Sequence, residues 1–227
     1  MNTVFIFSGV PYDFLRQRPH HMALFFEKKG YRVVYLSITD RVCIEHLQKI
    51  NDENTLFNVL FSENKDNIYI LNKRLIEYKS IERNLEQLTN KISEVFDHIN
   101  IAYIFAFPAW IKYFQKFPSN CKIIYDCMDD WESFISNIKM GYDEALLYDE
   151  RKLAVSAKRL YTKMSYLNSN IYYLPNGVWN KDYSDLENDE VPEDIYATEK
   201  PIIFFMGSVS EWVDINLIEY IANARPN

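Results

Sequence analysis

Hydrophobic positions in the first half of the chain fall into two patterns that alternate with each other. Short continuous apolar runs are typical of strands in a parallel sheet, which are covered on both faces. Over 77–98, apolar residues instead recur every three or four positions, which predicts an amphipathic helix. The expected strands here are 3–8, 32–36, 67–71, 101–106 and 122–125. Strands alternating with helices predict an α/β fold, a Rossmann-like parallel sheet flanked by helices.

The segment that joins the first two strands carries clear helix signals. Pro19 suits a first helical turn, and Gly30 follows a helix expected over 19–29. Strand, helix, glycine and strand in this order predict a βαβ unit with a right-handed crossover. The pattern of 41–63 is less regular, and only a short helix is expected there.

The same alternation continues after the fifth strand. Apolar runs at 152–156 and 171–174 predict two further strands. The helix between them is expected to begin after Ser156, whose hydroxyl suits an N-cap position. Pro175 and Gly177 then end the regular pattern.

A change of composition divides the chain near residue 180. The segment 180–200 holds eight carboxylates and little apolar material, as exposed linkers do. An apolar run at 202–206 then restarts the pattern, and Asp214 is placed to cap a last helix. We therefore expect a first domain over 1–180, an acidic linker over 181–200, and the first strand and helix of a second Rossmann-like domain over 201–227.

The overall composition excludes several classes of protein. A content of 48% hydrophobic residues allows a packed core, and a net charge of −7 argues against a general nucleic-acid binder. Three cysteines without a C-x-x-C pair predict neither a disulfide framework nor a zinc site, which suits the cytoplasm. The sequence gives no signal-peptide pattern and no apolar segment of membrane-spanning length.

The fifth expected strand ends in an acidic cluster, Asp126, Asp129 and Asp130, which Trp131 closes. Residues just beyond the carboxyl end of a parallel strand lie where α/β sheets bind ligands. Clustered like charges do not stabilise a fold, so raised pKa values or cationic partners are expected. The alternative is a solvated acidic loop in which Asp129 or Asp130 caps the next helix.

A basic cluster follows the first strand, where Gly9 begins the connection to the first helix. Arg16, Arg18 and His20 lie at the start of this helix, where cations and free N–H groups suit a phosphate. A solvated basic turn is the alternative interpretation. The neighbouring histidines are not spaced by four residues, so a helical zinc pair is not expected.

A second glycine turn follows the run at 202–206. Gly207 and Ser208 precede the last expected helix, where glycine allows a pyrophosphate to approach the backbone. An ordinary turn is the alternative, and no G-x-G-x-x-G sequence occurs. Trp131 and Trp212 suit stacking on sugar or base faces, and equally suit core packing. Cys127 lies beside carboxylates that raise a thiol pKa, so it is not expected to act as a nucleophile.

Four segments together resemble bacterial glycosyltransferases of the GT-B fold, of the capsule and exopolysaccharide type. They occur in the order of that family and cover essentially the whole chain. The segments are 8–19 (SGVPYDFLRQRP), 125–131 (YDCMDDW), 174–178 (LPNGV) and 205–212 (FMGSVSEW). The resemblance implies two Rossmann-like domains that face a cleft, the first binding the acceptor and the second a nucleotide-sugar. It implies no metal requirement and no further cofactor. Because most of the second domain is missing, this chain alone is expected to be inactive.

This interpretation gives each candidate residue a role in transferring a sugar to a cell-envelope polysaccharide. Asp126 would bind or deprotonate the acceptor hydroxyl, with Asp129 or Asp130 orienting it. The expected residues for the acceptor or its phosphate are Gly9, Arg16, Arg18, His20 and Trp131. The expected donor-binding residues are Gly207, Ser208, Glu211 and Trp212.

The partners expected are a nucleotide-sugar and a glycan or lipid-linked acceptor, without nucleic acid. A lipid-linked acceptor would bring the protein to the inner face of the cell membrane. Two alternatives stay open. The carboxylates Asp126, Asp129 and Asp130 suit a magnesium-dependent phosphoryl or sugar transferase. The chain also suits a non-enzymatic module that binds sugar phosphates.

Overall fold

The computed structural model describes residues 2–40, 42, 44–72, 85–98, 100–118, 120–130, 152–178, 193–197, 201–211 and 213–224. The chain divides into two compact units, Met1–Asn176 and Gly177–Asn227. Several expectations fall outside the described residues. These are the first part of the helix over 77–98, most of the linker over 181–200, and both Trp131 and Trp212.

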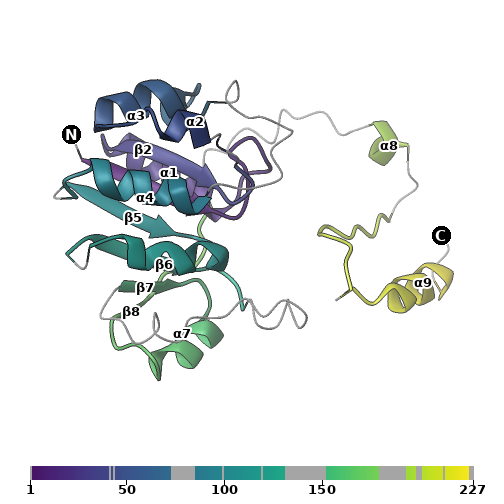
Figure 1. Cartoon of the computed structure of the whole chain (residues 1–227). Helices are drawn as coiled ribbons and strands as arrows, with labels where there is room; N and C mark the ends of the chain where they lie inside the picture. The colour runs from purple at the N-terminus through teal and green to yellow at the C-terminus, as the bar shows by residue number, and fades with distance from the viewer. Residues whose placement is uncertain are drawn as a thin grey trace. The chain divides into compact units, whose positions relative to one another are not determined.

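The first unit alternates strands and helices along the chain (Figure 1). Its strands are β1 (Thr3–Ser8), β2 (Arg32–Ser37), β3 (Phe61–Glu63), β4 (Ile68–Leu71), β5 (Ile101–Phe105), β6 (Lys122–Cys127), β7 (Lys152–Val155) and β8 (Ile171–Tyr173). Its helices are α1 (Arg18–Lys28), α2 (Ile44–Leu47), α3 (Glu53–Leu60), α4 (Leu85–Val95), α7 (Lys158–Ser165) and the 3-10 helix η2 (Pro108–Lys116).

The strands of the described residues form one sheet of eight, in the order β3-β4-β2-β1-β5-β6-β7-β8. Every neighbouring pair is parallel except β3 and β4, so the predicted parallel sheet is confirmed. From β1 the chain moves outward to β2 and then β4, and it returns to the other side of β1 as β5. This reversal between β1 and β5 is the topological switch point of a Rossmann-like sheet, beside which such sheets bind ligands.

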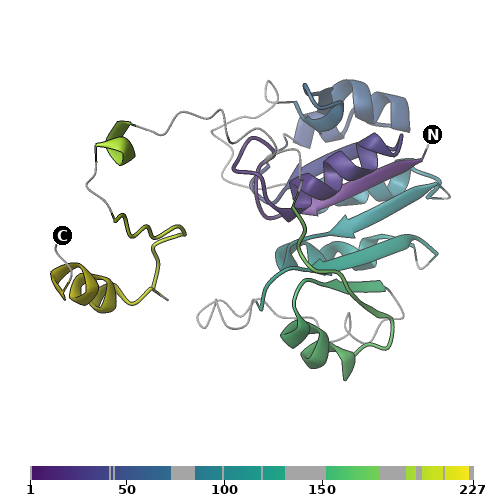
Figure 2. The same cartoon turned by 180° about the vertical axis from the view of Figure 1, so that it is seen from behind.

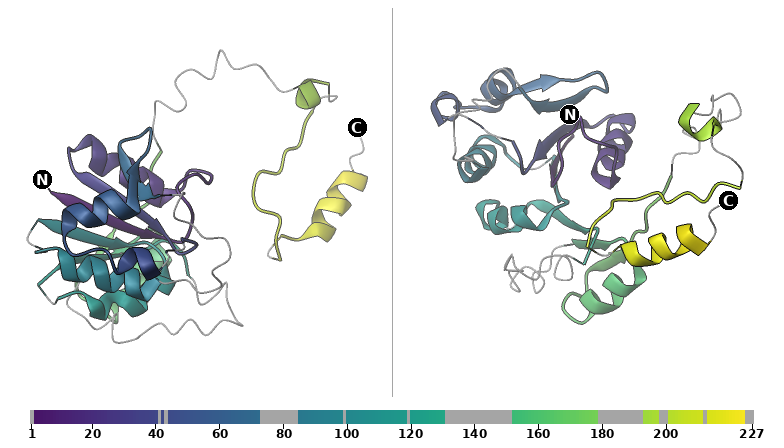
Figure 3. Two further views of the ribbon diagram at one scale, coloured as in Figure 1. Left: turned by 45° about the horizontal axis from the view of Figure 1, so that its top comes forward. Right: turned by 90° about the vertical axis from the view of Figure 1, so that its right-hand side faces the viewer.

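Two hydrophobic cores cover the two faces of the sheet. On one face, Ala23 of α1 packs against Val4, Ile6 and Tyr35, and Figure 2 shows α1 lying along that side. The other face carries α3, α4, η2 and α7, as the views in Figures 1 and 3 show. Because both faces are covered, the strands read as continuous apolar runs, which is why the sequence predicts them well.

Four local features differ from the sequence expectations. Helix α3 and strand β3 were not expected, although Asp52 caps α3 by accepting a 2.9 Å bond from the Thr55 N–H. Strand β6 continues two residues further than expected and therefore includes Asp126. Ser156 does not cap α7, because its hydroxyl donates instead to the Met128 carbonyl at 2.5 Å.

The second unit holds α8 (Glu193–Tyr196) and α9 (Ile215–Ala224) in its described part. Asp214 caps α9 as predicted, since its carboxylate accepts a 2.9 Å bond from the Leu217 N–H. The strand expected at 202–206 is wrong, because this run has no ladder partner among the described residues. Its side chains are exposed, and no residue of α9 is buried. No helix in the described part of the chain is long and apolar enough to cross a membrane.

Candidate functional site

The connection after β1 packs closely on the connection after β5. A Cβ atom at position 9 would lie 2.5 Å from Cδ2 of Phe107, so only glycine fits beneath this ring. The buried indole of Trp110 donates a 2.8 Å bond to the Ser8 carbonyl at the end of β1. Gly9 is therefore required for packing at the switch point, and its contact with a phosphate stays a prediction.

His20 holds the loop that leads from β1 into α1. Its Nδ1 accepts a 3.0 Å bond from the Gln17 N–H, so Nε2 carries the proton and donates to the Pro11 carbonyl at 3.0 Å. The ring is buried, and burial lowers its pKa, so the imidazole is neutral near pH 7. Because both nitrogens are used, His20 has no proton left for a phosphate, and this geometry does not favour that predicted role.

Arg18 and Asp126 form a two-bond ion pair across the carboxyl edge of the sheet. Arg18 Nε and Nη2 donate to the two carboxylate oxygens of Asp126, each at 2.8 Å. The side chains are 11% and 1% exposed, respectively. Arg18 Nη1 also donates to Asn176 Oδ1 at 3.1 Å. One guanidinium thus ties the start of α1 to the end of β6 and to the segment after β8.

Arg18 and Asp126, which this pair joins, were predicted from the sequence to have separate roles. Arg18 was expected to bind a phosphate and Asp126 to act as a base. Both carboxylate oxygens of Asp126 accept a bond from Arg18, so this carboxylate is engaged within the protein and its geometry does not favour direct contact with a substrate hydroxyl. The phosphate-binding role of Arg18 and the catalytic role of Asp126 both stay predictions, and the geometry indicates that the pair holds this edge of the sheet together.

The other two carboxylates of the acidic cluster, Asp129 and Asp130, do not share the partner of Asp126. Asp130 accepts a 2.8 Å bond from Lys163 of α7. Asp129 is exposed, although its carboxyl group is desolvated enough to raise its pKa. Burial raises the pKa of the Cys127 thiol to about 12, with a smaller effect from the nearby carboxylates, as expected for a thiol that is not a nucleophile. No group of three metal-ligating side chains gathers among the described residues.

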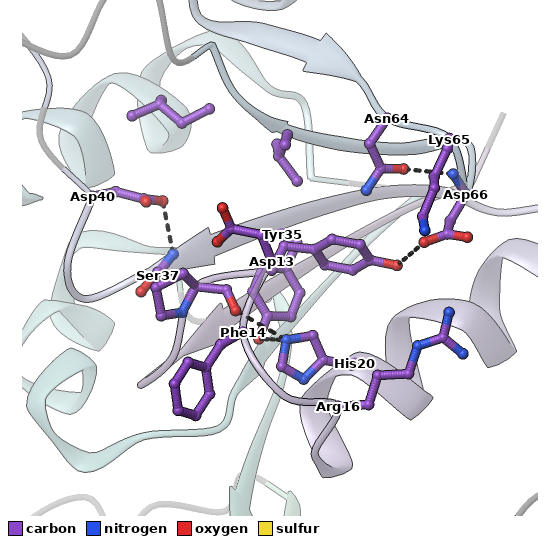
Figure 4. A pocket seen from close by; sticks show the side chains of 14 residues that line it. Asp13, Phe14, Arg16, His20, Tyr35, Ser37, Asp40, Asn64, Lys65 and Asp66 are labelled. Carbon is purple, nitrogen blue, oxygen red and sulfur yellow. Dashed lines mark hydrogen bonds between the residues drawn. The ribbon is translucent and has the colours of Figure 1, made fainter. Parts of the chain in front are cut away.

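A cavity of about 440 Å³ lies elsewhere in the first unit, on the side of the sheet that carries α1. The loop after β1 lines it together with side chains of β2, β4 and the turn between β3 and β4 (Figure 4). The polar and aromatic lining residues are Tyr12, Asp13, Phe14, Arg16, His20, Tyr35, Ser37, Asp40, Asn64, Lys65 and Asp66. Of the expected site residues that the structure describes, Arg16 and His20 line this cavity.

Asp40 stands at one end of the cavity, three residues beyond the end of β2. Its Oδ2 accepts a 2.8 Å bond from the Ser37 N–H. Burial raises the Asp40 pKa to about 6, with a smaller contribution from the charge of Asp13, against the lowering effect of the Ser37 bond. A carboxyl group with a pKa near 6 exchanges protons readily near neutral pH, which suits acid–base chemistry.

The turn 64–67 forms the opposite end of the cavity, as Figure 4 shows. Asn64 Oδ1 accepts bonds from the N–H groups of Asp66 and Ile68, at 2.9 and 3.0 Å. Asp66 in turn accepts a 3.0 Å bond from the Tyr12 hydroxyl, which joins the turn to the loop after β1. These contacts hold an amide and a carboxylate in place at the cavity wall.

Asp40, Asn64 and Asp66 were not predicted from the sequence. A signal for Asp40 was present, because it follows an apolar strand just as Asp126 does. No comparable signal exists for the turn, since only the pairing of β2 with β4 brings it to the loop after β1.

The residues expected to bind the donor lie in the second unit. Gly207, Ser208 and Glu211 are exposed, and a Cβ atom at position 207 would meet only the Phe205 ring, at an ordinary 3.5 Å. Their role stays a prediction. Comparisons with protein-family models, with curated proteins and with solved structures found no match to this chain. The resemblance of the four sequence segments therefore stays a prediction as well.

Proposed function

We propose that this chain is the acceptor-binding part of a glycosyltransferase that transfers a sugar from a nucleotide-sugar to a cell-envelope polysaccharide. The single observation that carries the proposal is the cavity beside β2. It combines carboxylates, an amide and aromatic rings on a Rossmann-like sheet. Pockets of roughly 300–1,000 Å³ hold small ligands, and carboxylates with aromatic rings suit a sugar. The four sequence segments supply the reaction type.

Within this proposal, Asp40 is the base that accepts the proton of the acceptor hydroxyl. The acceptor oxygen then forms a bond to the anomeric carbon of the donor sugar, and the nucleoside diphosphate leaves. Asp40 suits this step better than Asp126, because it faces a cavity and its pKa lies close to neutral pH. Asp126 would instead hold Arg18, and so keep the start of α1 in place.

The remaining parts of the proposal concern the donor and the location of the protein. Gly207, Ser208, Glu211 and Trp212 are proposed to contact the nucleotide-sugar. A cytoplasmic location is proposed because that compartment keeps the cysteines reduced. A lipid-linked acceptor would bring the protein to the inner face of the membrane.

The test is to delete the gene that encodes this chain in its host and to analyse the surface polysaccharide. The expected result is a shortened or absent polysaccharide, restored by the wild-type gene and by Asp52→Asn, a change outside the cavity. Asp40→Asn should restore it poorly, because an amide cannot accept the proton. An unchanged polysaccharide in the deletion strain would refute the proposed function.

A further inference from the structure

The charged residues of the cavity divide into an acidic interior and a basic rim. Asp40 and Asp66 are partly buried against the sheet and the turn 64–67, whereas Arg16 and Lys65 are exposed. His20 adds no positive charge, because it is neutral and both of its nitrogens are used. Among the described residues no cation pairs with Asp40 or Asp66, although the charge of Arg16 reaches Tyr12 and His20, so an anionic group placed beside these two carboxylates would be repelled.

The hydrogen-bonding groups of the interior suit a ligand that both donates and accepts. In the part of the chain that the structure describes, one carboxylate oxygen of Asp40 and one of Asp66 have no bond to the protein. They can accept bonds from ligand hydroxyls. Asn64 uses its carbonyl oxygen for the turn, and its side chain also interacts with Tyr12; its NH₂ group carries two N–H donors, so one is left for a ligand. Hydroxyl groups pair with both kinds of partner.

An apolar ring completes the lining. Phe14 lies at the cavity and is 52% exposed, although it is a large hydrophobic side chain. The C–H face of a sugar ring packs on such an aromatic face, while its hydroxyls bond at the edges. Figure 4 shows Phe14 on the side of the cavity nearer Ser37, and Asp66 on the side nearer Asn64.

We infer that the cavity binds an uncharged pyranose ring through its hydroxyls, and that it excludes phosphorylated and acidic sugars. This inference rests on the proposed function and specifies its acceptor. The accepting end of the glycan is a neutral sugar, and any phosphate of a lipid-linked acceptor lies outside the interior. Arg16 and Lys65 at the rim are the cations available to such a phosphate.

The test is a binding experiment on the full 227-residue chain with matched ligands. The probes are methyl glucopyranoside, methyl galactopyranoside and methyl mannopyranoside, each compared with its 6-phosphate and its uronic acid by ligand-observed NMR. We expect at least one neutral glycoside to bind, and its two anionic counterparts to bind at least about tenfold more weakly.

Two variants show whether the interior carboxylates cause the discrimination. Asp40→Asn and Asp66→Asn should each lower the affinity for the neutral glycoside. Each should also reduce the ratio of its affinity to that of the 6-phosphate. Asp52→Asn, at the N-cap of α3 and outside the cavity, should change neither the affinity for the neutral glycoside nor its preference over the 6-phosphate. Equal or tighter binding of an anionic counterpart, or no binding of any neutral glycoside, would overturn the inference. The deletion experiment is independent of this result, so a loss of polysaccharide without glycoside binding would overturn the inference alone.

Discussion

Two groups of carboxylates in the first unit differ in what surrounds them. At the end of β6, Asp126 and Asp130 each bond a cation that another part of the chain supplies. Around the cavity, the bonds that Asp40 and Asp66 accept from described residues come from neutral donors, a backbone N–H and a tyrosine hydroxyl. The paired carboxylates hold elements together. Unpaired carboxylates at a cavity cost stability, and groups of that kind are found where a ligand binds.

The largest expected effect comes from breaking the buried pair. Arg18→Met leaves the Asp126 carboxylate buried without its cation, and we expect a loss of about 3–5 kcal/mol in the free energy of unfolding. Urea unfolding followed by circular dichroism measures this loss. The double variant Arg18→Met/Asp126→Leu should recover most of it, because no uncompensated charge remains.

A matched control for that experiment is Arg16→Met. Arg16 is exposed, so its replacement should change the free energy of unfolding by no more than about 0.5 kcal/mol. If Arg18→Met cost as little as this control, the pair would not hold the edge of the sheet together.

The next largest effect is expected at Asp40, where substitution should raise the free energy of unfolding instead of lowering it. Its pKa is about 6 in the folded protein against 3.8 ordinarily, so the folded state holds a proton that the unfolded state releases between these values. The contribution of Asp40 to the free energy of unfolding therefore falls by roughly 2–3 kcal/mol as pH rises from about 4 to about 6, and this contribution stays constant above that range.

Asp40→Asn removes this cost because asparagine does not ionise, while its amide oxygen can still accept the Ser37 N–H. We expect the variant to be more stable than the wild type at pH 7–8 by up to about 2–3 kcal/mol. The advantage should disappear near pH 4. Thermal unfolding across this pH range measures it, and a variant less stable than the wild type at pH 7 would show that Asp40 is a stabilising group.

The smallest effect is expected for the Lys163–Asp130 pair, the more exposed of the two ion pairs near the end of β6. Lys163 and Asp130 are partly exposed, so water and salt screen their attraction. Lys163→Met should lower the free energy of unfolding by less than about 1 kcal/mol, and high salt should abolish the difference. A loss that persisted at high salt would place Asp130 with Asp126 as a structural anchor.

An element could be predicted from the sequence where the interactions that form it leave a pattern along the chain. The strands β1, β2, β5 and β6 were predictable because each is an apolar run buried on both faces. Helix α3 was not predicted although Asp52 is its cap and Leu56 and Leu60 are spaced by four residues, because the apolar pattern of the surrounding segment 41–63 is irregular.

The candidate site was harder to predict than the fold, since sequence shows neighbours along the chain and not across a sheet. Asp126, Asp129 and Asp130 form a cluster in sequence, yet in the structure Asp126 and Asp130 bond partners 108 and 33 residues away. Asp40 and Asp66 are far apart in sequence and line one cavity. The run at 202–206 failed as a strand for a related reason, because a strand needs a neighbour to bond and its own composition cannot supply one.

The contact between position 9 and the Phe107 ring limits how this protein can evolve. Any residue other than glycine brings a Cβ atom, which at 2.5 Å would overlap the ring. A change at position 9 therefore requires either that the Phe107 ring shifts or that a smaller side chain replaces it. Among divergent relatives the two positions should vary together, with a larger residue at one accompanied by a smaller residue at the other.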